Sequence, residues 1–236
     1  MDFKIIKKDT VTSTNTLLKE MARQGAQDGT VLAAYEQTAG RGRMGRIFYS
    51  PVTGLYFSIL LRENNADPAL LTTLAAVCVM KGIHETYGIS TQVKWVNDLI
   101  YNGKKVCGIL TESSFENGKL DYAVIGIGIN ISTPDFPQDI ENVAGSLNAD
   151  IGLRDALLEN ILKYFGEELP QINSRKFLDY YRERCITTGK NVTVRPFGAP
   201  AYEAFAIGID NDAALKIKLP DGTEKTVSSG EVTLHL

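Results

Sequence analysis

The sequence predicts an α+β fold followed by a small β-barrel. Between residues 93 and 130, strand-like segments follow one another without an intervening helix, which is typical of an antiparallel meander. Long helical segments lie beside this run rather than alternating with its strands, and this favours α+β over doubly wound α/β. After Thr187-Thr188-Gly189 only short strands and turns follow. We therefore expect a mixed, largely antiparallel sheet in residues 1–187 and a barrel in residues 188–236.

The first elements are a strand, a helix and a buried strand. Phe3–Ile6 is strand-like, and Ser13-Thr14-Asn15 precedes apolar residues at helical spacing. Small hydroxyl and amide side chains are common helix caps, and they also suit a polar, uncharged ligand group. Val31–Tyr35 predicts a buried strand that ends at Glu36-Gln37.

The other predicted elements follow from apolar runs and turn signals. Asp67-Pro68 predicts a helix start, and Asn102-Gly103 predicts a tight hairpin. The predicted strands are 55–61, 93–96, 99–101, 105–110, 122–130, 192–194, 202–209, 215–219 and 232–234, and the later helices are 153–169 and 174–184. A further turn is expected at Glu116-Asn117-Gly118.

The composition excludes several classes of function. Lysine and arginine total 25 against 28 acidic residues, for a net charge of −3, so no global basic field favours nucleic acid. The chain has no apolar run of signal-peptide or membrane-spanning type, and we expect a cytoplasmic protein without membrane contact. Cys78, Cys107 and Cys185 are too scattered for a zinc site or a disulfide framework, and His84 and His235 are isolated.

The segment Gly40–Arg46, which we call the glycine–arginine loop, interleaves three glycines with three arginines. Glycine lets the backbone approach a ligand, and arginine offers a planar fork of donors to phosphate or carboxylate oxygens. Taken alone, the loop is also compatible with an RNA-contacting turn or a solvated basic loop. It lacks the Gly-Lys-Ser/Thr of a Walker P-loop.

Five motifs, taken together in chain order, resemble those of the biotin protein ligases. They are Ser13-Thr14-Asn15, the Gly-Arg-Gly-Arg-x-Gly-Arg loop, Lys94-Trp95-Val96-Asn97-Asp98, Lys105–Glu112 and Gly126–Asn130. The resemblance covers nearly the whole chain. It implies a catalytic domain of the class II aminoacyl-tRNA synthetase and biotin ligase type, followed by an SH3-like barrel.

The resemblance also implies a two-step reaction. ATP and biotin form biotinyl-5′-AMP with the help of Mg²⁺, and a lysine of a biotin carboxyl carrier protein then takes the biotinyl group. We expect Arg43 and Lys105 to be catalytic by stabilising charge in the transition state. The expected biotin-binding residues are Ser13, Thr14, Asn15, Gln37, Arg41, Gly42, Arg43, Lys105 and Gly108. The expected adenylate-binding residues are Arg41, Arg43, Arg46, Phe48, Asn97, Lys105 and Asn130, with Asp98 as a possible Mg²⁺ ligand from its chemistry.

The chain departs from the family pattern at three positions. Val96 replaces a proline, Phe48 replaces a tryptophan, and Met44 stands where many relatives carry a charge. We expect Val96 to restore a strand-compatible backbone and Met44 to pack inward when the loop closes. Ser13 stands so early that we expect no helix-turn-helix and no direct repressor activity. A homodimer is plausible by analogy alone.

Three alternatives remain open at this point. A lipoate or octanoate ligase shares the superfamily fold, but its apolar substrate would make poor use of Ser13-Thr14-Asn15. A biotin-binding protein without catalysis is the second, and the presence of Arg43 and Lys105 speaks against it. A basic-loop RNA-binding protein is the most remote, since no interleaved aromatic residues are visible.

Overall fold

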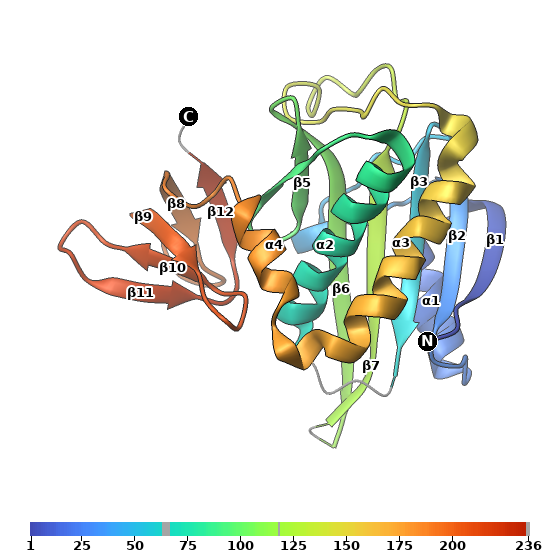
Figure 1. The fold of residues 1–236 in the computed structure, drawn as a ribbon, viewed down its shortest axis with the longest axis horizontal. Coiled ribbons are helices and arrows are strands. Elements are labelled where there is room, and N and C mark those ends of the chain that lie inside the picture. The colour runs from blue at the N-terminus through green and yellow to red at the C-terminus, as the bar shows by residue number, and fades with distance from the viewer. Residues whose placement is uncertain (63–66, 118, 235–236) are drawn as a thin grey trace.

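A large sheet covered by helices on both faces forms the main body of the protein. The computed structural model describes residues 1–62, 67–117 and 119–234. Gly118 of the predicted turn and His235 lie outside the described residues. Figure 1 shows helices α2 and α3 on one face of the sheet and α1 on the other. The predicted α+β class is confirmed.

The helices and strands follow in this order. The helices are α1 (Thr14–Arg23), α2 (Pro68–Tyr87), α3 (Arg154–Glu168) and α4 (Phe177–Glu183), with short 3-10 helices at η1 (Arg43–Gly45), η2 (Ile151–Leu153) and η3 (Leu169–Ser174). The strands are β1 (Lys4–Val11), β2 (Thr30–Gln37), β3 (Gly54–Leu61), β4 (Gln92–Lys94), β5 (Asp98–Tyr101), β6 (Lys104–Glu116), β7 (Lys119–Asn130), β8 (Asn191–Arg195), β9 (Tyr202–Ile209), β10 (Leu215–Lys218), β11 (Glu224–Val227) and β12 (Glu231–Leu234).

The main sheet has the strand order β1-β2-β3-β7-β6-β5-β4. Strands β4 to β7 form the predicted meander, and β7 then pairs with β3. All pairs are antiparallel except β1 with β2, which are joined through α1 and lie parallel. The sheet is therefore mixed and largely antiparallel, as expected.

Local sequence accounts for the ends of the helices. Ser13 caps α1, since its Oγ accepts a hydrogen bond from the backbone N of Thr16 at 3.5 Å. Asp67 caps α2 by accepting from Ala69 N at 2.7 Å, and Pro68 occupies the first turn. Helix α2 ends at Gly88, whose φ of 68° is left-handed.

The two faces of the sheet carry separate hydrophobic clusters. On the α1 face, Leu18 and Ala22 of the helix pack on Leu32, Leu60 and Val124 of the sheet. On the opposite face a larger cluster joins the sheet to α2 and α3. Because β3 is covered on both faces, all eight of its residues are buried, which explains why they are apolar except Ser58.

The C-terminal strands form a second sheet with the order β11-β10-β9-β8-β12. Its core is continuous with the large hydrophobic cluster of the main body. The Trp95 indole lies at this junction and donates from Nε1 to Ala213 O at 2.9 Å. Trp95 is thus a core residue, as expected, whereas closure of the second sheet into a barrel and the boundary at residue 187 stay predictions.

Two expectations about local structure were wrong, and one strand was missed. Helix α4 begins at Phe177 and not at 174, because the 3-10 helix η3 occupies the preceding turn. Val96 does not lie in a strand, since residues 95–97 form a turn that contains a cis Trp95–Val96 peptide bond. Strand β11 was not predicted, because Glu224–Val227 has only one buried residue, Val227.

Among the described residues, we find no helix with both the length and the apolarity needed to cross a membrane.

Candidate functional site

The candidate site lies on the α1 face of the main sheet, where three glycines remove the side chains from neighbouring strands. Gly108 of β6 pairs with Gly128 of β7, and Gly126 pairs with Leu110 one step along the same face. A Cβ atom on Gly128 would lie 2.5 Å from Phe48, and one on Gly126 would overlap Asn15 Oδ1. The bare backbone therefore leaves room for neighbouring side chains to lie directly on the sheet.

A buried polar network joins the start of α1 to strands β2 and β3. Gln37 Oε1 accepts hydrogen bonds from Thr14 N at 2.8 Å and from Thr14 Oγ1 at 3.1 Å. Ser58 Oγ lies 2.6 Å from Asn15 Oδ1 and 2.8 Å from Thr14 Oγ1. The structure thus brings Thr14, Asn15 and Gln37 together, directly after the capping residue Ser13. Such a set of hydroxyls and amides suits a polar, uncharged ligand.

Glu112 supports this network from strand β6. It accepts from Lys19 Nζ at 2.6 Å and from Asn15 Nδ2 at 3.0 Å, and Asn15 Nδ2 also donates to Leu110 O. Burial raises the pKa of the Glu112 carboxyl, but the hydrogen bonds from Lys19 and Asn15 outweigh it and leave the pKa below its ordinary value. Glu112 is therefore held as an anion that orients Asn15.

The glycine–arginine loop begins after the end of β2 and folds back in a tight turn. Gly42 N donates to Arg46 O at 2.8 Å, and Met44 has a left-handed φ of 56° at the tip. Met44 is 59% exposed, and the expectation that it packs inward when the loop closes stays a prediction. The left-handed conformation of a non-glycine residue at the tip marks a tight turn.

Arg43 is the arginine of the loop that reaches into the site. It donates from Nη1 to Asn97 Oδ1 at 3.0 Å and from Nη2 to Gly230 O at 2.8 Å. Burial lowers the pKa of its guanidinium, while the negative charges of Asp98 and Glu231 act in the opposite direction. Arg43 is thus a partly buried cation that bridges the main sheet and the C-terminal sheet.

The other two arginines lie further out. Arg46 is paired with Glu231 at 2.7 Å, and its side chain is 66% exposed. Arg41 lies 4.0 Å from Glu112, at the edge of the polar network. Gly42, between Arg41 and Arg43, contributes the backbone turn rather than a side chain.

Phe48 and Lys105 meet over the glycine pair. The Phe48 ring covers the positions of Gly108 and Gly128, and Lys105 Nζ lies 5.9 Å from the ring centroid. Lys105 Nζ also lies 2.6 Å from Asp98 Oδ1, and Asp98 pairs with Gly108 in the sheet. An aromatic face, an ammonium and a carboxylate therefore share one edge of the site.

Asn97 and Asn130 complete this edge. Asn97 Nδ2 donates to Ile109 O at 3.0 Å while its Oδ1 accepts from Arg43. Asn130 Nδ2 donates to Gly145 O at 2.9 Å, and Gly145 N donates to Lys105 O. The Oδ1 of Asn130 is buried and has no hydrogen-bond partner within the described part of the chain. It offers an acceptor to a ligand hydroxyl or amine.

Carboxylates are too sparse for a cage of protein ligands around a metal ion. Nowhere in residues 1–62, 67–117 or 119–234 do three His, Cys, Asp or Glu side chains cluster suitably. Mg²⁺ in nucleotide enzymes is commonly held by one or two carboxylates together with substrate phosphates. Asp98 fits this limited role, although Lys105 already engages one of its oxygens.

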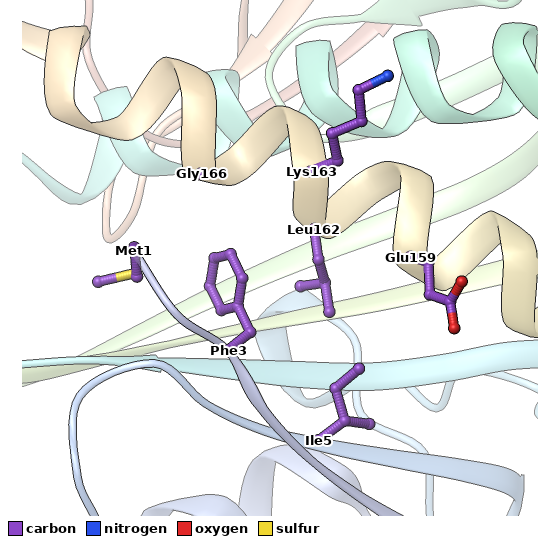
Figure 2. Close-up of a pocket in the computed structure, with 7 residues that line it drawn as sticks. All are labelled: Met1, Phe3, Ile5, Glu159, Leu162, Lys163 and Gly166. Carbon is purple, nitrogen blue, oxygen red and sulfur yellow. The ribbon is translucent and has the colours of Figure 1, made fainter.

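The predicted site is separate from a cavity of 360 Å³ on the other face of the sheet. Figure 2 shows this cavity between the N-terminal strand and α3, lined by Phe3, Ile5 and Leu162 among others. Its one lysine, Lys163, is paired with Glu85. None of the predicted site residues lines it.

Sequence reasoning missed several residues of the site. Ser58 interrupts an otherwise apolar strand, and this was a usable signal. Glu112 and Gly126 lay within recognised motifs but received no role. Gly230 and Glu231 contact the loop from the far end of the chain, and no local pattern marks them.

Comparisons with known proteins identify the family. The biotin/lipoate A/B protein ligase family matches residues 8–130, and the biotin protein ligase C terminal domain matches residues 187–234. The bifunctional ligase/repressor BirA of Bacillus subtilis is 35% identical, over 95% of this chain and 72% of the relative. The biotin–[acetyl-CoA-carboxylase] ligase of Mycobacterium tuberculosis is 30% identical, over 95% of this chain and 86% of the relative.

The fold has close counterparts among solved structures. A biotin protein ligase from Aquifex aeolicus in complex with biotin and ATP has a TM-score of 0.81 and 29% identity, with 98% of each chain covered. The same enzyme without ligand has a TM-score of 0.79. The sequence motifs and these matches point to the same family. The chain belongs to the biotin/lipoate A/B protein ligase family and, within it, to the biotin protein ligases.

Proposed function

We propose that the chain is an ATP-dependent biotin protein ligase that modifies a lysine of a biotin carboxyl carrier protein. The proposal rests on one observation: uncharged polar groups and cations lie next to each other on a glycine-lined surface. Thr14, Asn15 and Gln37 form an uncharged polar network, and the cations Arg43 and Lys105 lie beside it. The uncharged polar groups suit the ureido ring of biotin, and the two cations suit a carboxylate that approaches a phosphate.

In the first step, a biotin carboxylate oxygen attacks the α-phosphorus of ATP and pyrophosphate leaves. Both reacting groups are negative, so cations must offset their repulsion. Arg43 and Lys105 are suited to this role, because partial burial strengthens their interaction with developing charge. We assign Ser13, Thr14, Asn15, Gln37, Gly42 and Gly108 to biotin, and Arg41 to both ligands.

The adenylate is proposed to lie along the edge formed by Phe48, Asn97, Lys105 and Asn130, with Arg46 further out. Asp98 would be the protein carboxylate nearest to Mg²⁺, which supplies charge neutralisation for the phosphates when it is bound. In the second step, the amine of the carrier lysine attacks the acyl carbon of biotinyl-5′-AMP. The bond to the phosphate oxygen breaks, AMP leaves, and the nitrogen loses its proton.

The decisive experiment measures ATP-dependent transfer of biotin to a carrier domain by the wild-type chain and by Arg43→Ala and Lys105→Ala. We expect labelling by the wild type and a loss on the order of 10²–10³ in rate for each variant. In pyrophosphate exchange, biotin should be active and lipoate should not. Exchange with lipoate alone would contradict the proposal, and biotin binding without transfer would indicate a non-catalytic protein.

Three further expectations remain proposals. Relatives such as BirA of Bacillus subtilis are named bifunctional ligase/repressor. We nevertheless propose that this chain does not bind an operator, which a binding assay with a biotin-operon promoter fragment checks. We also propose a cytoplasmic location, where ATP and carrier proteins are present. The third proposal is a homodimer, which rests on analogy with relatives alone, and sedimentation measures it directly.

A further inference from the structure

Ser50 is a buried polar residue that has no role in the assignments above. It lies just after the glycine–arginine loop and is 4% exposed. Its carbonyl accepts a hydrogen bond from Gln37 N at 3.1 Å, so the chain leaving the loop is paired with the end of β2. Its hydroxyl is therefore held between Gln37 and the loop.

The Ser50 hydroxyl accepts one hydrogen bond and donates another. Gln37 Oε1 accepts from the backbone N of Thr14, which can only donate, and this fixes the orientation of the Gln37 amide. Gln37 Nε2 consequently donates to Ser50 Oγ at 3.0 Å. Ser50 Oγ in turn donates its proton to Phe48 O at 2.8 Å. A chain of hydrogen bonds thus runs from Thr14 through Gln37 and Ser50 to Phe48.

The base of the loop is packed around this contact. Phe48 N donates to Gly40 O at 2.9 Å. A Cβ atom on Gly40 would lie 2.5 Å from Ser50 Oγ and would overlap Phe48 O, so only glycine leaves the Ser50–Phe48 bond intact. The backbone of Phe48 is therefore held on two sides.

The position of the Phe48 ring affects the position of the Lys105 ammonium, because the two are neighbours. A Cβ atom on Gly108 would lie 3.0 Å from the Phe48 ring and 3.1 Å from Lys105 Nζ, so ring and ammonium occupy adjacent places over the same glycine. A shift of the Phe48 backbone moves the ring against Lys105. The Ser50 hydroxyl therefore connects the polar network to the cationic edge.

We propose that Ser50 is a positioning residue that couples the polar ligand pocket to the placement of Phe48 and Lys105. The inference rests on the proposed function in naming biotin as the ligand. A ligand that fixes the Gln37 amide also fixes its donor bond to Ser50, and through it the carbonyl of Phe48. Ser50 itself touches neither the pocket ligand nor the reacting atoms.

The test compares Ser50→Ala with Thr53→Val. Thr53 lies three residues further on, and its hydroxyl makes a hydrogen bond of 3.0 Å with Thr133 outside the network. Ser50→Ala loses the hydrogen bonds with Gln37 and Phe48, and Thr53→Val loses one with Thr133, so thermal unfolding of both variants gives the temperature below which their kinetics can be compared in the folded state. Only Ser50→Ala should raise the KM for biotin about tenfold and lower kcat, whereas Thr53→Val should leave both near their wild-type values.

A double variant separates coupling from simple destabilisation. If Gln37 acts through Ser50, the rise in KM for biotin in Gln37→Ala/Ser50→Ala should match that of Gln37→Ala alone. Independent effects that multiply would overturn the proposal. So would Ser50→Ala kinetics indistinguishable from those of Thr53→Val.

Cleavage by trypsin tests the positioning role without relying on the proposed reaction. The loop carries Arg41 and Arg43, which are trypsin cleavage sites. Without any substrate, cleavage of the loop should be faster in Ser50→Ala than in Thr53→Val, since Phe48 has lost its anchor. Equal cleavage rates would contradict the positioning role. A wild-type chain inactive towards biotin would refute the proposed function and leave this comparison valid.

Discussion

Arg43 and Gly230 stand 187 residues apart and are joined by a hydrogen bond of 2.8 Å from Nη2 to the carbonyl oxygen. The same guanidinium donates to Asn97, in the turn between β4 and β5 of the main sheet. The glycine–arginine loop is therefore held by both sheets at once. A planar fork of donors is needed to reach both acceptors.

Replacing Arg43 by lysine keeps the charge and removes the fork. A single ammonium cannot span Asn97 Oδ1 and Gly230 O, so we expect kcat/KM for the exchange reaction to fall about tenfold or more. Arg195→Lys, in the same C-terminal sheet, is the control and should stay near wild type. Equal activity of Arg43→Lys and wild type would show that charge alone is sufficient.

Lys105 and its neighbour Lys104 allow a matched test of the proposed cation. Lys105→Met should lower the rate of adenylate formation by a factor on the order of 10²–10³, because charge next to the reacting phosphate is lost. Lys104 donates to Glu141 O at 3.0 Å and is exposed, so Lys104→Met should change the rate little. Pyrophosphate exchange measures both, and a similar loss in the two variants would contradict the assignment.

A methyl group on Gly126 should close the polar pocket. Its Cβ would overlap Asn15 Oδ1, so Asn15 must leave its bonds to Ser58 and Glu112. We expect Gly126→Ala to weaken biotin binding about 100-fold or more, as measured by calorimetry. Gly208 has open space around it, and Gly208→Ala is the matched control in the other sheet. Unchanged binding in Gly126→Ala would place the ligand elsewhere.

Glu112 predicts a dependence of stability on pH. Its folded-state pKa lies below the ordinary value of 4.5, so ionised Glu112 stabilises the fold above that pH and loses this effect as the pH falls through the folded-state pKa. Glu112→Gln should therefore cost about 1–2 kcal/mol near neutral pH and progressively less in acid. Urea unfolding of both proteins measures this difference, and a loss that is constant with pH would contradict the ion-pair argument.

Much of the fold follows from local patterns. Capping by Ser13 and by Asp67-Pro68, the hairpin at Asn102-Gly103 and the meander up to Asn130 all arise from interactions between near neighbours. Strand β11 could not be predicted in this way, since its exposed residues carry no apolar alternation. Val96 was misjudged because a turn set by its surroundings outweighs the strand preference of valine.

The site was predicted as a set of motifs but not as a network. Arg43, Asn97, Asp98 and Lys105 do lie together, as the motif order suggested. The partners that hold them come from distant parts of the chain, as Gly230 does for Arg43, and depend on how the two sheets pack. Ser50 gives no signal in sequence, because a serine before a proline is a common turn element. The roles of single residues can therefore be assigned only once their positions in three dimensions are known.

The bare patch formed by Gly108, Gly126 and Gly128 has a consequence for engineering. Glycine within a strand costs about 0.5–1 kcal/mol relative to alanine. Alanine would not recover this cost, because its Cβ atom would lie 3.0 Å or less from Asn15 or Phe48 at each position. Variants selected for heat resistance should therefore keep all three glycines, since the missing methyl groups are what admit Asn15 and Phe48.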